Sequence, residues 1–451
     1  MRRRRHVVIT GAGLVVALCA ASGAEAASAA CTPVAAGTPR TLLERVPALI
    51  SSPMTPTADG GAVIAFASYR GSREFSHARF TVLGLDPAGC TRWRVSLPGE
   101  WPLTRPLQAD AKTIVAGAST RRGLGIYTLS ASTGRVLHKD VLASLSPTSG
   151  NAPTMVADAR GNVAALLATR QSAGTGGRSE AVTVKLTRPA HATRWTQTVI
   201  ARSNTSDPAA AALPDGRMVV GYPRRGRFWV RLGTVAGSLG APRDAGPITA
   251  NFRGADVSLG KDGTVAAVWE STTYSRPWRL RAAVLPARAR RFAPSVLIGA
   301  FPGRSGTLLN PATAAVHVGA AGQVTIGFAV ASLQDADPLM CVTGTRAGRF
   351  SAPVQVAATA PGFGAELPAM VFGRTGTATS VLAAVPPDDS QILYALLTLD
   401  SGCRVHGSAS IAAASGPVAA TMIDARGRTW ILGQEHPSVD SRRPLLLTIA
   451  R

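Results

Sequence analysis

The stretch KDGTVAAVWE, residues 261–270, places an Asp-Gly pair directly before an apolar run that contains a tryptophan. The same arrangement occurs in LPDGRMVVGY (213–222), DARGNVAALL (158–167) and DARGRTWILG (424–433). A tight hairpin turn needs a positive φ, which glycine adopts without steric cost, and short runs of Val, Leu and Ile favour strands. Each copy therefore predicts two strands joined by a tight turn.

This turn recurs along the whole chain. One turn residue before each apolar run marks the repeat: Gly60, Ala111, Gly161, Gly216, Gly263, Gly322, Gly376 and Gly427. Successive positions are 47 to 59 residues apart, and several units begin with a proline eight residues before the glycine. A fixed period of this length indicates an internal structural repeat.

Each unit contains four short predicted strands. In one unit they are PTMVADARG, NVAALLATR, AVTVKLTRP and RWTQTVIA. Units of four antiparallel strands, repeated many times, predict an all-β fold, a β-propeller of four-stranded blades. The predicted domain spans 30–451, with units at 50–100, 101–150, 151–203, 204–249, 250–303, 304–360, 361–414 and 415–451.

The number of blades and the closure of the ring follow from the irregular units. Eight blades are predicted, and seven is the alternative if the second unit, QADAKTIVAG, whose turn has no glycine, is irregular. The last unit has no fourth strand of its own, and residues 40–49 (RTLLERVPAL) offer one. Pairing them would remove free sheet edges, which otherwise invite aggregation.

Three phrases of the chain resemble those of known propellers. NPATAAVHVGAAGQVTIGF resembles the inner-strand repeats of sialidase-like bacterial propellers, and GLDPAGCTRW and TLSASTGRVLH resemble a turn of quinoprotein-like propellers. The resemblance, to secreted bacterial β-propeller repeat proteins, implies an architecture but no particular enzyme family.

The sialidase comparison does not extend to catalysis. IDARGRTW has Asp424, Gly427 and Trp430 of the Asp-box of that family, but with one residue too many before the glycine. Neither Tyr69 nor Tyr274 matches the catalytic tyrosine. No catalytic residue is predicted.

The first residues predict export. A basic MRRRRH segment precedes the apolar VVITGAGLVVALCAASG and small-residue cleavage sites, so residues 1–29 are predicted to be a signal peptide. The Sec and twin-arginine routes both remain open. The expected location is extracellular; the alternative is a protein lipid-anchored at Cys31.

Four cysteines follow the predicted leader. Cys31, Cys90, Cys341 and Cys403 predict two disulfides in an exported chain. Proximity in sequence favours Cys31–Cys90 with Cys341–Cys403, and the other two pairings stay open. None of the cysteines has metal-ligand spacing, so neither a metal nor a cofactor is expected.

The chain is strongly basic, with a formal charge of +23 and a pI of about 11.4. Such a charge attracts polyanions, and outside a cell these include teichoic acids, anionic headgroups and acidic polysaccharides. Motifs for specific nucleic-acid recognition are absent from the sequence. The expected partner is an anionic envelope polymer or a protein, bound by a monomer.

Candidate site residues come from the loops that enter the inner strands and from those joining second and third strands. The candidate ligand-binding residues are Arg105, Asn151, Asp207, Arg253, Trp269, Glu270, Asn310 and Glu366. The candidate polyanion-binding residues are Arg70, Arg121, Arg122, Arg224, Arg225, Arg227 and Arg276.

Two functions fit these features. One is a non-catalytic exported scaffold that binds a polyanion or a partner protein. The other is a carbohydrate-active enzyme with a diverged propeller site. An enzyme should place two carboxylates roughly 5–10 Å apart at the channel mouth.

Overall fold

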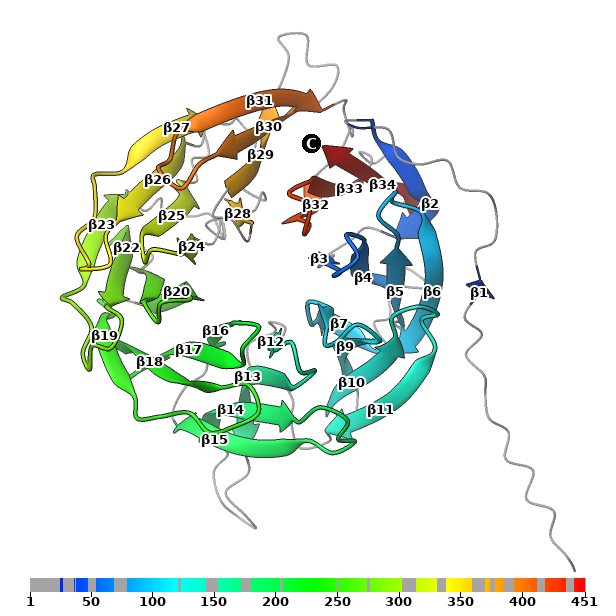
Figure 1. Cartoon of the computed structure of the whole chain (residues 1–451), viewed down its shortest axis with the longest axis horizontal. Helices are drawn as coiled ribbons and strands as arrows, with labels where there is room; N and C mark the ends of the chain where they lie inside the picture. Colours follow the sequence, from blue (N-terminus) through cyan, green and yellow to red (C-terminus); the bar gives the residue numbers. More distant parts are fainter. Residues whose placement is uncertain are drawn as a thin grey trace, which may run out of the picture.

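The described strands form eight antiparallel sheets arranged in a ring (Figure 1). The computed structural model describes residues 25–26, 36, 38–47, 54–68, 79–120, 123–142, 153–171, 180–202, 206–249, 251–273, 276–301, 314–330, 338–358, 370–373, 378–384, 393–411, 418–434 and 442–450, and these contain no helix. The eight-bladed β-propeller predicted from the repeat is confirmed, and the alternative of seven blades is wrong.

The first four blades follow one another along the chain, each from its inner to its outer strand. Blade 1 has β3 (Met54–Pro56), β4 (Ala62–Ser68), β5 (Arg79–Leu85) and β6 (Thr91–Pro98), with β1 (Glu25–Ala26) paired to β6. Blade 2 has β7 (Glu100–Leu103), β8 (Leu107–Gln108), β9 (Thr113–Thr120), β10 (Gly123–Ser130) and β11 (Val136–Leu142). Blade 3 has β12 (Thr154–Ala157), β13 (Val163–Gln171), β14 (Glu180–Arg188) and β15 (Thr196–Arg202). Blade 4 has β16 (Ala209–Ala212), β17 (Arg217–Arg224), β18 (Arg227–Thr234) and β19 (Arg243–Pro247).

The remaining blades complete the ring. Blade 5 has β20 (Asn251–Leu259), β21 (Val265–Thr273), β22 (Arg276–Leu285) and β23 (Val296–Phe301). Blade 6 has β24 (Ala315–Val318), β25 (Val324–Ala329), β26 (Pro338–Gly344) and β27 (Val354–Ala358). Blade 7 has β28 (Val371–Phe372), β29 (Ala378–Ala384), β30 (Leu393–Leu399) and β31 (Val405–Ile411). Blade 8 has β32 (Val418–Ile423), β33 (Thr429–Gln434), β34 (Arg442–Ala450) and β2 (Arg40–Pro47).

The second unit, whose first turn has no glycine, is a blade with an interrupted inner strand. Both β7 and β8 pair with β9, and residues 104–106 separate them. Pro106 cannot donate a ladder hydrogen bond. The buried Thr104 replaces part of the ladder: its Oγ1 donates to the carbonyl of Gly117 and accepts from the Gly117 N–H.

Hydrophobic clusters between neighbouring blades form the core. Trp93 of blade 1 is 1% exposed, and its indole N–H donates to the Ala131 carbonyl of blade 2. A Cβ at Gly134, which has a φ of 67°, would stand 2.5 Å from the Trp93 ring. The glycine is therefore required both by the turn and by the tryptophan that it covers.

Four of the Asp-containing turns share one hydrogen-bond pattern. In blade 3, Oδ1 of Asp158 accepts the backbone N–H groups of Arg160 (3.0 Å) and Asn162 (3.1 Å), and Gly161 has a φ of 86°. The same pairing of one carboxylate oxygen with the amides two and four residues ahead occurs at Asp86, Asp400 and Asp424. The recurrent phrase of the sequence is thus a structural turn.

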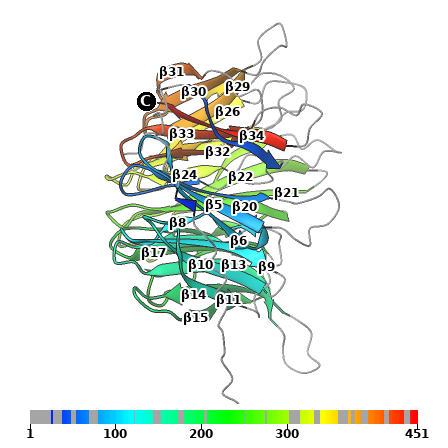
Figure 2. The ribbon, with the colours of Figure 1, turned by 90° about the vertical axis from the view of Figure 1, so that its right-hand side faces the viewer.

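The first and last strands of the domain close the ring. β2 pairs antiparallel with β34, so the predicted closing strand is confirmed for residues 40–47. Seen from the side, the strands run across the thickness of the disc, with β32, β33 and β34 stacked beside blade 1 (Figure 2). Closure leaves neither blade 1 nor blade 8 with an unpartnered face.

Arg428 fastens blade 8 to blade 1. Its Nε bonds Oδ2 of Asp424 at 2.7 Å, and its Nη atoms donate to the carbonyls of Pro87 (2.7 Å) and Gly60 (2.9 Å). The Trp430 indole also donates to Asp424 Oδ2. Burial raises the pKa of Asp424, but the hydrogen bonds from Trp430 and Arg428 outweigh it and lower that pKa overall.

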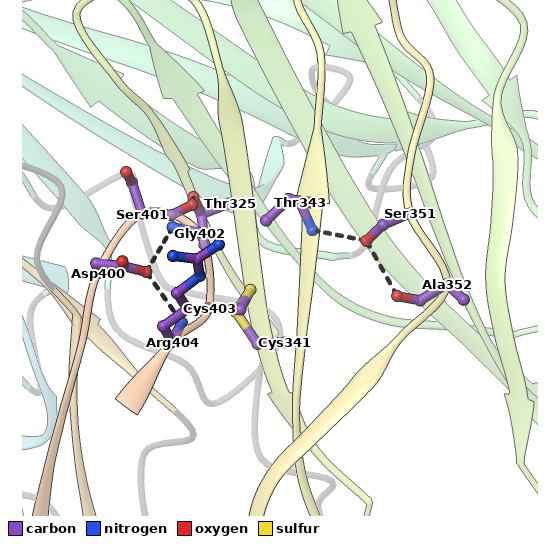
Figure 3. Close-up of a disulfide and its surroundings, with 10 residues drawn as sticks. All are labelled: Thr325, Cys341, Thr343, Ser351, Ala352, Asp400, Ser401, Gly402, Cys403 and Arg404. Carbon is purple, nitrogen blue, oxygen red and sulfur yellow. Dashed lines mark hydrogen bonds between the residues drawn. A yellow bond between two sulfur atoms is a disulfide. The ribbon is translucent and has the colours of Figure 1, made fainter. Parts of the chain in front are cut away.

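The disulfide Cys341–Cys403 joins blade 6 to blade 7, which confirms that part of the predicted pairing (Figure 3). Cys90 is also disulfide-bonded, but Cys31 lies outside the described residues, so the second pair stays a prediction. The turns that contain Cys90 and Cys403 differ by one position. Cys403 has a φ of 65° and occupies the position that Gly89, with a φ of 83°, occupies in the blade 1 turn. Cys90 lies one residue after that position.

We predict that Arg428→Met lowers the free energy of unfolding by about 3 kcal/mol, because it leaves the buried Asp424 carboxylate without its cation. Chemical denaturation measures the change. Arg426→Met is the matched control, since the Arg426 side chain is exposed and only its backbone N–H bonds Asp424. Equal losses in both variants would contradict a specific role for Arg428 in closure.

Candidate functional site

Each blade presents turns to two opposite faces of the ring. Because the strands are antiparallel, the turns joining strands 1 to 2 and 3 to 4 share one face, here called the hairpin face. The 2-to-3 loops and the inter-blade connections share the other, here called the loop face. The sequence places the predicted site on the loop face.

Many of the predicted site residues lie outside the described part of the chain. These are Asn151, Asn310, Glu366, Arg70, Arg121 and Arg122. The acidic residues of the corresponding blade 6 and blade 7 loops also lie outside it: Asp335, Asp337, Asp388 and Asp389. Arg276 is the first residue of β22.

Trp269 and Glu270 are core residues. Trp269 is 0% exposed, stacks on Phe228 at 5.2 Å between ring centroids, and donates its indole N–H to the Pro247 carbonyl. Glu270 is 2% exposed, and its Oε1 accepts the N–H of Ala314 at 2.8 Å. Trp269 packs blade 4 against blade 5, so no face of its ring is free for a sugar.

Asp207 and Arg253 lie at different depths. Asp207 is half-buried between β15 and β16, and its carboxylate accepts the N–H of Ala168 at 3.5 Å. Arg253 lies on β20 with an exposed side chain.

The RRGR turn of blade 4 is a two-residue hairpin. Arg225 (φ 49°) and Gly226 (φ 71°) are its central residues, and Arg224 pairs with Arg227. The guanidinium of Arg227 bonds Asp244 at 2.5 Å. Arg225 is exposed, so it is the cation of this turn best placed to meet a ligand.

Three side chains of blade 5 bond the free edge of β24 in blade 6. Glu270 accepts the N–H of Ala314, Asp256 that of Val316 (2.9 Å), and Ser258 that of Val318 (3.0 Å). Alternate residues of a strand direct their N–H groups to the same edge. Residues 314, 316 and 318 are therefore consecutive donors on one edge, and all three are satisfied.

The charge of Arg105, in blade 2, also acts on Asp256. Burial raises its pKa to about 6, while hydrogen bonds from Val316 and Val257 and the charge of Arg105 act in the opposite direction. Arg105 belongs to blade 2, and its Nε donates to the carbonyl of Met54 in β3. Although the side chain of Arg105 keeps solvent contact, desolvation among the inner strands lowers its pKa, and Asp256 opposes this shift.

Glu270 and Asp256 form a carboxylate pair with different proton affinities. Burial raises the pKa of Glu270 to about 8, and the N–H of Ala314 opposes that rise. The two amides that they bind are two residues apart on one strand, so the carboxylates lie about 7 Å apart. Near neutral pH, Glu270 keeps its proton and Asp256 is largely ionised, which is an acid–base arrangement.

Sequence reasoning missed Asp256. Its signal is a carboxylate in the middle of GADVSL, where the inner strand otherwise carries small or apolar residues. Its partners lie 60 residues ahead in blade 6 and in blade 2, so no local pattern reveals the cluster.

The hairpin face, not assigned any ligand from the sequence, carries many exposed cations. They are Lys112, Arg135, Arg160, Arg194, Lys261, Arg288, Arg290, Arg291, Arg346, Arg349, Arg404 and Arg426. The described aspartates of these turns are fewer, and they accept turn N–H groups: Asp59, Asp86, Asp110, Asp158, Asp215, Asp262, Asp400 and Asp424. The described part of this face is therefore net positive.

The described residues contain neither a metal-binding cluster nor a membrane-spanning helix. Among them, no three His, Cys, Asp or Glu side chains gather as they would around a metal ion. They also include no helix of the length and apolarity needed to cross a membrane.

Comparison with solved structures supports the fold class. The quinohemoprotein alcohol dehydrogenase of Comamonas testosteroni matches with a TM-score of 0.50 at 10% identity, over 93% of this chain and 76% of that one. An ulvan lyase matches at 0.45 and 10% identity (92% and 95% covered), and the Dos1 propeller at 0.43 and 9% (89% and 95%). No protein-family model and no curated protein matches the chain. This chain has an eight-bladed propeller fold.

We predict that Glu270→Gln stabilises the protein progressively as the pH rises. In the unfolded chain the group titrates near 4.5 and in the folded protein near 8. The stability contributed by Glu270 is complete below the lower value and falls by about 1.4 kcal/mol per pH unit up to the higher one. Glutamine does not titrate and can still accept the N–H of Ala314.

The measurement is the difference in unfolding free energy between variant and parent from about pH 5 to about pH 9. It should rise in favour of the variant and level off above about pH 8. Glu180→Gln, on an exposed ion pair with Arg202, should show no such rise. A flat difference for Glu270→Gln would refute the raised pKa.

Proposed function

We propose that this protein is an exported, non-catalytic propeller that binds an anionic polymer of the cell envelope. The charge of the described hairpin face carries the proposal, because exposed Arg and Lys side chains outnumber aspartates whose oxygens already accept turn amides. A surface of this kind concentrates polyanions at low ionic strength. The exposed Arg225 of blade 4 extends the positive charge to the loop face.

Export is the second part of this proposal. Its support is the basic and apolar N-terminal segment together with the Cys341–Cys403 disulfide, which is typical of oxidising compartments. Cleavage after Ala26 or Ala29 would also remove the short strand β1, leaving the four strands of blade 1 intact.

Retention on immobilised polygalacturonate, with neutral dextran as the comparison, tests polymer binding. We expect retention on the anionic matrix at low salt and elution as salt screens the charges, since the Debye length falls to about 10 Å at 0.1 M. Passage through both columns at low salt would refute the proposal. A panel of envelope polymers then identifies the ligand.

For the loop face, we predict that replacing Arg224, Arg225 and Arg227 with Ser lowers retention several-fold at low salt. Added salt should erase the difference. Thermal stability should change little, because the Arg227–Asp244 pair is substantially exposed, at 46% and 35%. The triple Lys variant at these positions keeps the charge and should bind like the parent. Unchanged retention of the Ser variant would exclude this turn from the binding surface.

A carbohydrate-active enzyme is the second candidate, and the Glu270–Asp256 pair favours it. The separation of about 7 Å matches that of carboxylates that activate a water in inverting glycosidases. Against this, both groups already accept backbone N–H groups, and Glu270 is 2% exposed. Release of sugar products from a polysaccharide panel, lost in both Asp256→Asn and Glu270→Gln, would establish the enzyme; no release from any member favours the scaffold.

A further inference from the structure

Six arginines without acidic partners gather on the outer hairpin turns of blades 5, 6 and 7. They are Arg288, Arg290, Arg291, Arg346, Arg349 and Arg404. All six are exposed, and no carboxylate among the described residues pairs with any of their guanidinium groups. Two exposed arginines of other blades, in contrast, are paired: Arg92 with Asp59 and Arg227 with Asp244. The described outer turns of blades 5 to 7 thus carry six unpaired arginines, against Arg135 in blade 2 and Arg194 in blade 3.

Exposed aliphatic side chains begin the outer strands that follow these turns. Val296, Val354 and Val405 are the first residues of the outer strands β23, β27 and β31, and they are 38%, 54% and 45% exposed. Leu297 follows at 43%. The outer strand of blade 2, β11, also carries exposed aliphatic residues, Leu137 (46%) and Val141 (40%), but the turn before it has a single arginine, Arg135. In blade 3 the equivalent first residue is the polar Thr196. We call the six arginines and these four aliphatic residues the blade 5–7 corner.

The three turns of this corner are fixed against one another. A Cβ at Gly348, in the blade 6 turn, would stand 2.7 Å from that of Ala293 in the blade 5 turn, so the two turns touch. The Cys341–Cys403 disulfide fastens the blade 7 turn to β26, and Thr325 Oγ1 donates to the Ser401 carbonyl at 2.8 Å (Figure 3). The positions of the turn backbones, and hence of the cations, are set before any ligand arrives.

We propose that the blade 5–7 corner docks on the surface of an anionic lipid bilayer. Guanidinium groups bind phosphate oxygens of headgroups through paired N–H donors, and each cation near an anionic leaflet contributes about 1 kcal/mol. The adjacent Val and Leu side chains gain free energy only where the partner offers an apolar phase. A lipid interface offers headgroup charge and that phase together, whereas a soluble polyanion offers charge alone. The six arginines also belong to the hairpin face proposed to bind a polymer, and the exposed aliphatic residues are what separate lipid docking from polymer binding.

Vesicle flotation tests it, using equal parts phosphatidylcholine and phosphatidylglycerol against phosphatidylcholine alone. We expect the protein to float only with the anionic vesicles. Replacing Arg346, Arg349 and Arg404 with Ser should lower the partition coefficient on the order of a hundredfold. The control replaces Arg135, Arg160 and Arg194, exposed cations of blades 2 and 3, with Ser. It removes the same charge and should cost far less.

A second variant separates lipid from polymer. Val354→Thr with Val405→Thr keeps strand propensity and introduces the residue type that blade 3 has at Thr196. It should lower vesicle partitioning about tenfold while leaving retention on polygalacturonate unchanged. Equal losses in the two arginine triples, or an unchanged partition coefficient in the valine variant, would overturn lipid docking and leave only general attraction to anions. Thermal unfolding of each variant verifies that it is folded.

Discussion

Satisfying the backbone amides of strand edges is the constraint on which this ring depends. A four-stranded blade has two edges, and an unpaired edge costs free energy when buried and invites aggregation when exposed. On the outer side of blade 8, β2 supplies the partner that the C-terminal strands lack. On the inner side of blade 6, Glu270, Asp256 and Ser258 bind the amides that no strand reaches. Strand pairing and side-chain capping thus meet the same requirement at different places.

The same requirement explains why Glu270 and Asp256, which cap a strand edge, resemble a catalytic pair. Glu270 and Asp256 have the separation and the unequal proton affinities of an acid–base pair, and both result from burial beside a strand edge. Structural capping and catalysis need similar environments, because each places a carboxylate out of water next to a donor. A catalytic role requires a carboxylate oxygen that is not already bonded to the strand edge and that a substrate can reach, whereas a capping role does not.

The sequence could predict the features that depend on local conformation. Glycines at a regular period, an unpaired last unit and the spacing of Cys341 and Cys403 are sufficient for eight blades, closure by β2 and one disulfide. The carboxylate pair of Glu270 and Asp256 could not be found this way, because the partners of Asp256 lie in blades 2 and 6. The sequence predicts Trp269 as a ligand-binding residue, but its environment is set by Phe228 and Pro247 of the preceding blade. Contacts between blades leave no periodic trace in the chain.

The pairing of β2 with β34 also determines the order in which the protein can be made. Arg442 follows Arg40 by 402 residues, so at about 5 to 20 residues per second the ribosome takes about 20 to 80 s to supply the partner of β2. Until then, the chain carries an aliphatic strand with nothing to pair with, while blades 1 to 7 can already pack in sequence. The outer edge of blade 8 therefore stays open during synthesis until β34 has been made and can pair with β2.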